Sequence, residues 1–501
     1  MASLAMLTVG GCATLDADKK VQEAIDLVEQ HTGQRPAWTV PWDDQPPPWD
    51  GQSVLGLDEA VVMALRNNRE LRADLEMIGQ ANADLVQAGL LQNPTFNFMM
   101  MFPDGGGRTM LRSNALPMQP LQDLWLIPAR QEVATAELRK AVVRVADRAV
   151  ETAAAVKKVY ARLQYTQRAI ELIRDNMGVV DQSTRIIQVR QSAGQATQVE
   201  VNLSRIRYLR LRSELMAMEA EHRALQRELL MLMGFPGATD AWRVEPVQET
   251  QEVLEAPAGE PDLLSLAAER RLDLKAAEWD VQAAEKRIRL MHREGWPELA
   301  LAFTFERAPG PRSRNLGIPG QLGNAAAEGV ANGLAGMPPA TSVPMTPPFG
   351  VTRREVTYTL GPMIEMEIPI FDRNQAQVAK AVHEYRQRLA EYDARAQEIT
   401  RRVYETRIIY AQACAQVRFF RDSVMPEVER NLKLAQQAFI AGQENLTIYL
   451  QTQEDLIMTR LRILEFLRDG LVGRAELERE VGGRLESEPR PSGSGPIGVD
   501  D

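Results

Sequence analysis

The chain has 501 residues, of which 45% are hydrophobic and 25% are charged, with only 33 glycines and 29 prolines. This composition indicates a folded, helix-rich protein and argues against a disordered one. The net charge of −10, with acidic and basic residues interspersed, provides no basic stripe, so nucleic acid is not an expected partner.

The first twelve residues resemble the end of a bacterial lipoprotein signal. An apolar stretch from Met1 ends in Val9-Gly10-Gly11-Cys12, which resembles a lipobox. Cys12 is therefore expected to carry lipid, and Ala13 after it resembles the outer-membrane sorting pattern. The stretch lacks the Lys or Arg of an ordinary signal peptide, so the alternative is that Cys12 is a plain apolar thiol.

Elsewhere the sequence gives no sign of a disulfide framework or of a membrane-spanning helix. Cys414 is the only other cysteine and is expected to pack as a small hydrophobe. No run of 18 or more apolar residues occurs.

The chain contains an internal duplication. Residues 68–73 and 93–94 recur at an offset of 203 residues, whereas residues 193–195 and 233–234 recur at an offset of 248. The second copy therefore carries 45 additional residues. The stretch from Arg307 to Arg354, rich in Gly, Pro, Ala and Asn, is the expected insertion between two strands.

Each copy is predicted to contain a helix, two strands, a long helix and a returning helix. Apolar residues spaced by three and four within 128–192 and 374–440 form heptad seams, and each run would span roughly 100 Å as a helix. The first seam is Val142, Val145, Ala149, Thr152, Val156, Val159, Leu163, Thr166, Ile170 and Ile173. The second is Val378, Val382, Tyr385, Leu389, Tyr392, Ala396, Ile399, Val403, Tyr410, Ala413, Val417, Phe420 and Val424.

Both long helices are expected to reverse direction at a glycine. Gly194 and Gly442 stand at the predicted ends, and glycine readily takes the left-handed conformation that ends a helix. The returning helices continue the seams with Val199, Leu203 and Ile206 in the first copy and with Leu446, Leu450, Ile457, Leu461 and Leu464 in the second. Each copy thus predicts a coiled-coil hairpin.

Alternation of apolar and polar residues predicts strands at equivalent places in both copies. Such patterns occur at 95–102, 298–306 and 356–371. A further strand near 114–126 is placed only by symmetry, because Pro117 and Pro120 interrupt it. One face of each pattern is uniformly apolar, which is typical of a transmembrane barrel strand.

Four strands per chain cannot close a barrel. An open sheet edge in lipid leaves backbone groups unpaired, at several kcal/mol each, so the chain is expected to oligomerise. The smallest membrane barrels have about eight strands, so two copies are the minimum, and three would supply twelve strands around a wider, water-filled pore. A soluble β-sandwich on a coiled coil is the alternative, although the uniformly apolar face favours the barrel.

Several motifs occur in a characteristic order and spacing. They are Leu57-Asp58-Glu59-Ala60 with Ala64-Leu65-Arg66-Asn67-Asn68, Ala88-Gly89-Leu90-Leu91-Gln92-Asn93-Pro94, Ile368-Pro369-Ile370-Phe371-Asp372-Arg373-Asn374 and Phe439-Ile440-Ala441-Gly442. Between about Leu55 and Gly483 the chain thereby resembles the TolC-like outer-membrane factor (outer membrane efflux protein) family, lipoprotein type. The resemblance implies a mainly α fold with a membrane β-barrel, in which a homotrimer shares twelve strands above a periplasmic α-barrel.

This resemblance also divides the chain into expected regions. These are a lipoprotein signal at 1–12, a periplasmic extension at 13–54, a first repeat at 55–234, an equatorial linker at 235–261, a second repeat at 262–482 and a tail at 483–501. The protein would be lipid-anchored in the bacterial outer membrane, with a helical tunnel in the periplasm. Its partners would be a periplasmic adaptor and a proton-driven inner-membrane pump.

The hairpin tips are the expected sites of function. Adaptor contacts are assigned to Gly194, Gln195, Thr197, Val199, Gly442, Gln443, Asn445 and Thr447. Family members often ring the entrance with acidic residues beyond the second glycine, but this chain has Ile448 and Gln451 there. Glu200, Glu444 and Gln451 are the alternative entrance-lining candidates, and simple solvated tip charges are the competing interpretation.

The function favoured by these patterns is passive conduction and not catalysis. The four histidines are scattered without metal-ligand spacing, so no catalytic residue, metal or cofactor is expected. Met99, Met100, Met101, Met110 and Met118 suggest Cu(I) chemistry, but ordinary apolar filling is the favoured explanation. The alternative functions are the duct of a one-step protein secretion system and a coiled-coil structural lipoprotein without a pore. The cargo, the gating residues and the role of the insertion are not specified by the sequence.

Overall fold

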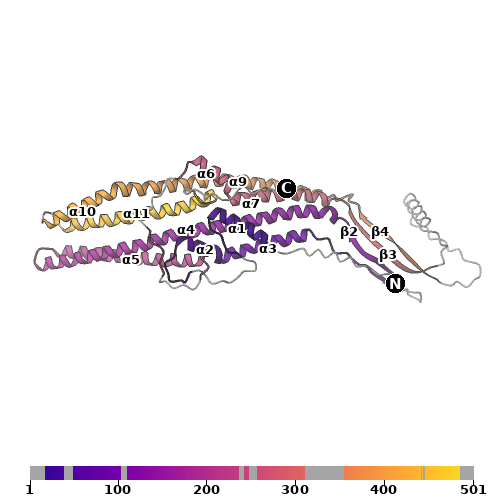
Figure 1. The fold of residues 1–501 in the computed structure, drawn as a ribbon, viewed down its shortest axis with the longest axis horizontal. Coiled ribbons are helices and arrows are strands. Elements are labelled where there is room, and N and C mark those ends of the chain that lie inside the picture. The colour runs from indigo at the N-terminus through magenta and orange to yellow at the C-terminus, as the bar shows by residue number, and fades with distance from the viewer. Residues whose placement is uncertain are drawn as a thin grey trace, which may run out of the picture. The chain divides into compact units, whose positions relative to one another are not determined.

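The computed structural model describes residues 17–38, 49–102, 110–235, 242–247, 257–310, 355–441, 443 and 446–485. The chain divides into two compact units. One, here called the helical unit, comprises Met1–Ala88, Arg130–Arg289 and Val378–Asp501. The other, the strand unit, comprises Gly89–Ala129 and Leu290–Gln377. Figure 1 shows the helices and strands of both units.

The duplication predicted from the sequence reappears in the helix boundaries. Helices α2 (Leu57–Asn67) and α6 (Glu260–Arg270) are related by the 203-residue offset, and each is followed by a second helix, α3 (Arg69–Ala88) or α7 (Leu272–Glu294). The single first helix expected in each copy is therefore wrong. The break falls at Asn68 in one copy and at the equivalent Arg271 in the other, both with extended ψ angles of 123° and 118°.

The same backbone contact secures both breaks. Asn68 Nδ2 donates a hydrogen bond to the carbonyl of Leu232 at 2.9 Å, and Arg271 Nη1 donates to the carbonyl of Glu480 at 3.1 Å. Leu232 and Glu480 are related by the 248-residue offset. Each side chain thus joins its break to the end of its own returning helix.

Each helix break and the end of the returning helix that it contacts are here called a joint. At both joints a glycine allows the two backbone segments to approach closely. Gly234 has a φ of +65°, and a Cβ there would lie 2.1 Å from the carbonyl oxygen of Asn67. Gly482 has a φ of +82°, and its Cβ would lie 2.9 Å from the carbonyl carbon of Arg270. Only glycine fits both the conformation and the space.

The long helix of the first copy has the expected buried seam. Helix α4 spans Asp123–Ser192 and is followed by α5 (Gln198–Leu232). All the seam residues predicted between Val142 and Ile173 are buried. The predicted start at Pro128 is wrong, because α4 begins at Asp123. Pro128 lies within the first two turns, where its missing N–H removes a single backbone hydrogen bond.

In the second copy the expected continuous helix is interrupted. Helix α9 (Gln375–Phe419) passes through a π-turn, η1 (Phe420–Val424), into α10 (Met425–Ile440), and α11 (Leu446–Val481) returns. The Met425 N–H bonds the carbonyl of Phe420, five residues back. Pro426 has no backbone N–H to donate to the carbonyl four residues earlier, and its ring would clash with that carbonyl in a regular α-helix. The wider π-turn just before Pro426 relieves this clash.

The second seam is buried over only part of its length. Ile399, Val403, Tyr410 and Val417 are buried, but Leu389 is 41% exposed. In the first half of α9 the other seam residues, Val378, Val382, Tyr385, Tyr392 and Ala396, are only half-buried.

The returning helices differ from the expectation in one copy. Leu450, Leu461 and Leu464 of α11 are buried as predicted. In α5, however, Val199, Leu203 and Ile206 are exposed, and the neighbouring Val201 and Ser204 are buried instead. The expected packing of this stripe within the hairpin is wrong, because α5 turns the adjacent face toward its neighbours.

An N-terminal helix, α1 (Asp18–Thr32), joins the helical unit within the region expected as an extension. The Nδ1 atom of buried His31 hydrogen-bonds the carbonyl of Gly482, and the Arg484 N–H donates to the carbonyl of His31 at 3.3 Å. Helix α1 thus contacts the end of the second copy. None of the helices in the described ranges is long and apolar enough to cross a membrane.

The strand unit contains an antiparallel sheet in the order β1-β2-β3-β4. The strands are β1 (Phe98–Met101), β2 (Met110–Pro120), β3 (Glu298–Gly310) and β4 (Glu355–Glu367). The strands expected at 95–102, 298–306 and 356–371 correspond to β1, β3 and β4 with shifted ends. The insertion expected from Arg307 begins later, because β3 continues to Gly310, and residues 311–354 lie outside the described residues.

The strand expected near 114–126 lies earlier in the chain than predicted. Strand β2 ends at Pro120, and residues from Asp123 onward already belong to α4. Register shifts relative to β3 occur between Asn114 and Leu116 and between Leu116 and Gln119. These irregularities surround Pro117, which cannot donate a ladder hydrogen bond, and bulges are where an internal strand tolerates proline.

Candidate functional site

The tip of the first hairpin is a tight, exposed turn. Gly194 has a φ of +73°, and a Cβ there would meet open space. Thr197 and Glu200 form a capping box, in which the Glu200 N–H donates to Thr197 Oγ1 at 3.3 Å and the Thr197 N–H donates to Glu200 Oε2 at 2.9 Å. The predicted entrance residue Glu200 therefore holds the turn, in addition to supplying a charge at the tip.

The second tip closes with an equivalent hydrogen bond. The Gln443 N–H donates to the carbonyl of Ala438 at 2.9 Å, as the Gln195 N–H donates to that of Arg190 at 2.8 Å in the first copy. Thr447 and Gln451 are exposed on α11. The predicted contact residues Gly442 and Asn445 and the entrance candidate Glu444 lie outside the described residues.

A groove of about 590 Å³ separates the two hairpins beside these tips. Gln195, Glu200 and Thr447, all candidates from the sequence, line it together with residues of α4, α5 and α11. Arg207 of α5 forms an ion pair with Glu454 of α11 in its wall. The structure thus gathers candidates from both copies around one groove, whereas Gln451 does not line it.

The sheet has one apolar and one polar face. Cross-strand partners share a face, so the register assigns every strand residue to a side. The apolar face carries the exposed residues Phe98, Met100, Leu301, Phe303, Tyr358, Leu360, Ile364 and Met366, with Ser113 and Arg307 as its polar members. The polar face carries Arg112, Glu298, Thr304, Glu306, Thr359, Glu365 and Glu367. Residues on this apolar face have no cover within the described chain.

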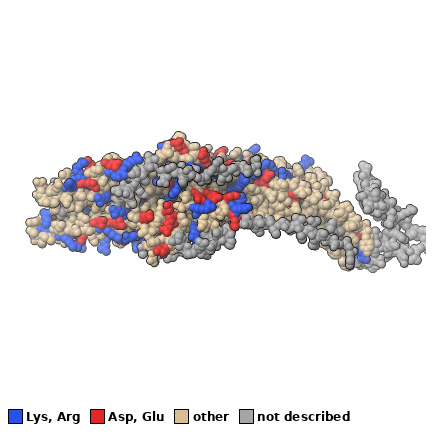
Figure 2. Space-filling view, viewed as in Figure 1, with Lys and Arg blue, Asp and Glu red and all other residues tan. Residues whose placement is uncertain are grey.

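The helical unit also has uncovered apolar residues among its charges. On the face shown in Figure 2, Lys, Arg, Asp and Glu are interspersed over the helices without a single-sign patch. Between them, α5 exposes Val199, Leu203, Ile206, Leu209 and Met216, and α9 exposes Leu389, Tyr404, Ile408, Ile409 and Phe419. These two groups, here called the α5 stripe and the α9 stripe, are larger than isolated surface hydrophobes and mark candidate interfaces.

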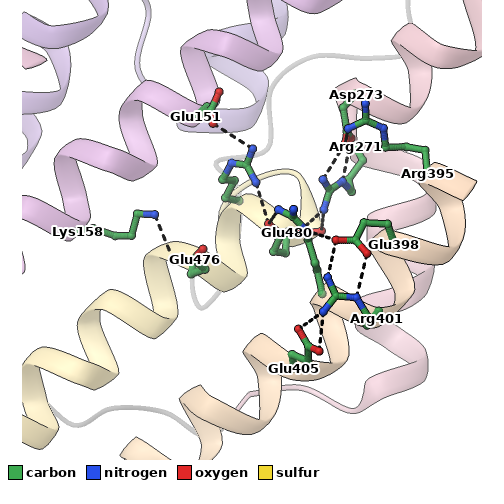
Figure 3. A network of polar contacts seen from close by, with 12 residues as sticks. Glu151, Lys158, Arg271, Asp273, Arg395, Glu398, Arg401, Glu405, Glu476 and Glu480 are labelled. Carbon is green, nitrogen blue, oxygen red and sulfur yellow. Dashed lines mark hydrogen bonds and ion pairs between the residues drawn. The ribbon is translucent and has the colours of Figure 1, made fainter. Parts of the chain in front are cut away.

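The second-copy joint is a buried ionic cluster that the sequence did not reveal (Figure 3). Arg271 pairs with Asp273 through two hydrogen bonds of 2.9 Å and also with the carboxylate of Glu480, which is 1% exposed. Arg479 donates to the same carboxylate at 2.8 Å. The first-copy joint has Asn68 and Leu232 in place of Arg271 and Glu480, so only the second joint has a buried ion pair between the helix break and the end of the returning helix.

Asp147 lies beside this cluster with an elevated pKa. Burial raises its pKa to about 6, and the nearby carboxylate of Asp273 adds to the shift, while Arg479 and Arg271 oppose it. Between about pH 4, the usual pKa of an aspartate, and about pH 6, Asp147 is therefore protonated in the folded protein but ionised in the unfolded chain. The resulting stabilisation is present at low pH and is lost as the pH rises through about 6.

Replacing Asp147 by Asn is therefore expected to flatten part of the pH dependence of stability. Between pH 5 and pH 7.5 the wild type should lose about 1–1.5 kcal/mol relative to the variant, because about one pH unit of the titration up to a pKa of about 6 lies in this range. Burial lowers the pKa values of His31 and His222, whose contribution has the opposite sign, so the two proteins are compared at each pH. Thermal unfolding followed by circular dichroism measures the difference. Parallel curves for both proteins would show that Asp147 is ionised throughout this range.

The structure tests the prediction for only one of the two cysteines. Cys414 is buried among apolar residues of α9, as expected, and burial raises the pKa of its thiol. Cys12, the expected lipidation site, lies outside the described residues.

The second copy matches a known family. Residues 263–483 fit the family model described as outer membrane efflux protein. No curated sequence matches the chain.

Solved structures share the fold over most of the chain. A membrane protein from Pseudomonas aeruginosa is 20% identical, with a TM-score of 0.65, covering 85% of this chain and 92% of its own. CusC is 17% identical, with a TM-score of 0.65 and coverages of 90% and 98%. The MtrE outer membrane channel of Neisseria gonorrhoeae, in its open state, is 15% identical, with a TM-score of 0.64 and coverages of 90% and 96%. At these identities the likeness establishes the fold.

Proposed function

We propose that this chain, whose residues 263–483 fit the outer membrane efflux protein family model, is the outer-membrane channel of a tripartite efflux system. It passively conducts substrates from a periplasmic adaptor and a proton-driven inner-membrane pump to the exterior. We also propose the division of the chain into regions that the sequence indicates, including the lipid anchor at Cys12 and the tail that begins at residue 483.

The two-faced open sheet is the observation that carries the proposal. Its exposed apolar face suits contact with lipid, and its polar face suits a water-filled lumen. Strands β1 and β4 are the sheet's edges. Within a membrane those edges need partners, because unpaired backbone groups there cost several kcal/mol each. Pairing β4 of one copy with β1 of the next closes twelve strands in a homotrimer.

The uncovered stripes of the helical unit support the same assembly. The α5 stripe and the α9 stripe lie on different helices, so contact between them would be head to tail, which forms a ring when the rotation between copies closes. Such contact would cover Leu209 and Met216 of the α5 stripe, whereas Leu203 and Ile206 line the groove between the two hairpins.

The adaptor is proposed to dock on the hairpin tips and the groove beside them. The tip residues are Gly194, Gln195, Thr197, Val199, Gly442, Gln443, Asn445 and Thr447, and Glu200, Glu444 and Gln451 are proposed to line the entrance. A helical partner with apolar residues at spacings of three and four would match an elongated groove of this kind. The Arg207–Glu454 ion pair crosses the groove and links both hairpins to the docking site.

Conductance across a planar lipid bilayer tests the channel. Purified trimers are expected to give discrete ion currents, whereas a structural lipoprotein without a pore would give none. A matched pair of neighbouring β4 variants locates the lumen. Leu360→Arg, on the apolar face, should cost about 2–4 kcal/mol per copy in lipid and prevent barrel assembly, whereas Thr359→Arg should assemble and alter ion selectivity. Assembly of the first variant with failure of the second would reverse the two faces.

A further inference from the structure

Three methionines meet on the polar face of the sheet. Met101 of β1 is directly opposite Met110 of β2, and Met99 is two residues from Met101 on the same side of its strand. The β2 residue opposite Met99 is Arg112, which in turn lies opposite Glu306 of β3. Alternation and cross-strand pairing therefore place all three thioethers on the face that carries Arg112 and Glu306.

Ordinary packing does not account for these side chains. Met99 and Met101 are 51% and 50% exposed. Methionine fills gaps on apolar surfaces, but under the proposed function this face is the wet interior of the barrel. Met100, between them, lies on the opposite face with Phe98 and has the lipid-facing role expected of an apolar residue.

The spacing suits a single soft ion. Directly opposed strand residues have Cβ atoms roughly 5 Å apart, and diagonal neighbours are roughly 7–8 Å apart. Methionine has a long, flexible side chain, so three sulfur atoms can converge from these positions. Thioethers are neutral, soft donors that select Cu(I) over oxygen-loving cations such as Mg²⁺ or Ca²⁺.

We infer that Met99, Met101 and Met110 form a thioether site for a soft monovalent metal ion, Cu(I) or Ag(I), on the lumenal face of each copy. This inference rests on the proposed function, because it needs the polar face to line the duct. The ion is cargo and not a resident cofactor. Neutral ligands on an exposed face allow exchange, so the site would hold a passing ion briefly near β1 and β2.

Silver binding to the purified trimer tests the inference. Ag(I) is titrated calorimetrically in chloride-free buffer into the wild type, into the Met99→Leu, Met101→Leu and Met110→Leu triple variant, and into a control with Met100→Leu, Met363→Leu and Met366→Leu. Leucine has nearly the same volume as methionine, so folding is expected to persist. All three proteins also carry Cys414→Ala, because a free thiol binds Ag(I) more tightly than thioethers do. Among the described residues, no group of three His, Cys, Asp or Glu could hold a metal ion.

The expected result is about one Ag(I) per chain in the wild type and the control, with at least a tenfold weaker affinity in the site variant. Binding should be unchanged between pH 6 and pH 8, because thioethers do not titrate. Equal binding by the site variant, or no binding by the wild type, would overturn the inference. Bilayer conductance of the same samples keeps the two proposals distinct: currents without silver binding overturn the metal site alone, whereas a wild type without currents overturns the channel.

Discussion

Replacing both Gly194 and Gly442 by leucine is expected to abolish export while leaving trimer assembly intact. A Cβ at Gly194 meets open space, so a leucine there projects outward from the tip into the region where the adaptor is proposed to bind. The φ of +73° adds about 1–2 kcal/mol of local strain, which an exposed turn can absorb without loss of the fold. Export is measured by the growth of cells challenged with a substrate of the partner pump.

The double alanine variant is the matched control. Alanine imposes the same left-handed strain at Gly194 but lacks the bulk, so export by this variant should remain close to that of the wild type. Loss of export in both variants would attribute the effect to tip conformation and not to a blocked surface. Normal export by the leucine variant, with trimers confirmed by size-exclusion chromatography, would remove the tips from the adaptor interface.

The order of helices and strands was predictable because the sequence contains an internal duplication. The offset of 248 residues maps the start of α5 at Gln198 onto that of α11 at Leu446, and the end of α4 at Ser192 onto that of α10 at Ile440. Periodicity is a local signal, so long seams and alternating strands were visible without tertiary knowledge. The buried seam of α4 and the two faces of the sheet follow from these patterns.

Features set by contacts distant in sequence were not predictable in the same way. The break at Arg271 depends on its hydrogen bond to Glu480, 209 residues away. The orientation of α5, which exposes Leu203 and buries Val201, depends on how the hairpin packs and not on the apolar pattern alone. For the π-turn, Pro426 was a visible local signal, and the prediction of an uninterrupted helix overlooked it.

The candidate site was only partly predictable for the same reason. Gly194 and Thr197 could be assigned to a tip because glycine and a capping residue mark a helix reversal. The groove and its Arg207–Glu454 pair join two copies of the repeat, so no single stretch of sequence contains them. The methionine triad likewise needed the register between β1 and β2, since adjacent methionines along one strand point to opposite faces.

Removing Arg271 is expected to destabilise the helical unit strongly. The Arg271→Met variant keeps most of the apolar stem but leaves the carboxylates of Asp273 and Glu480 without their shared cation. Both are largely buried, with side chains 12% and 2% exposed, and breaking a buried ion pair in this way costs about 3–5 kcal/mol. Arg395, 3.6 Å from Asp273, and Arg479, 2.8 Å from Glu480, still neutralise part of the two carboxylate charges. The loss of stability is therefore expected at the lower end of this range.

The first copy provides the design of the control. Changing Arg271→Asn together with Glu480→Leu installs the neutral pair found at Asn68 and Leu232, including the side-chain hydrogen bond to the backbone. Because Glu480 is removed together with Arg271 and only Asp273 loses its cation, this double variant should lose less stability than Arg271→Met. Thermal unfolding of detergent-solubilised trimers, followed at 222 nm, provides the comparison. If the double variant is as unstable as Arg271→Met, the ion pair stabilises the second joint in a way that the neutral pair cannot. The two joints would then be equivalent in backbone geometry alone.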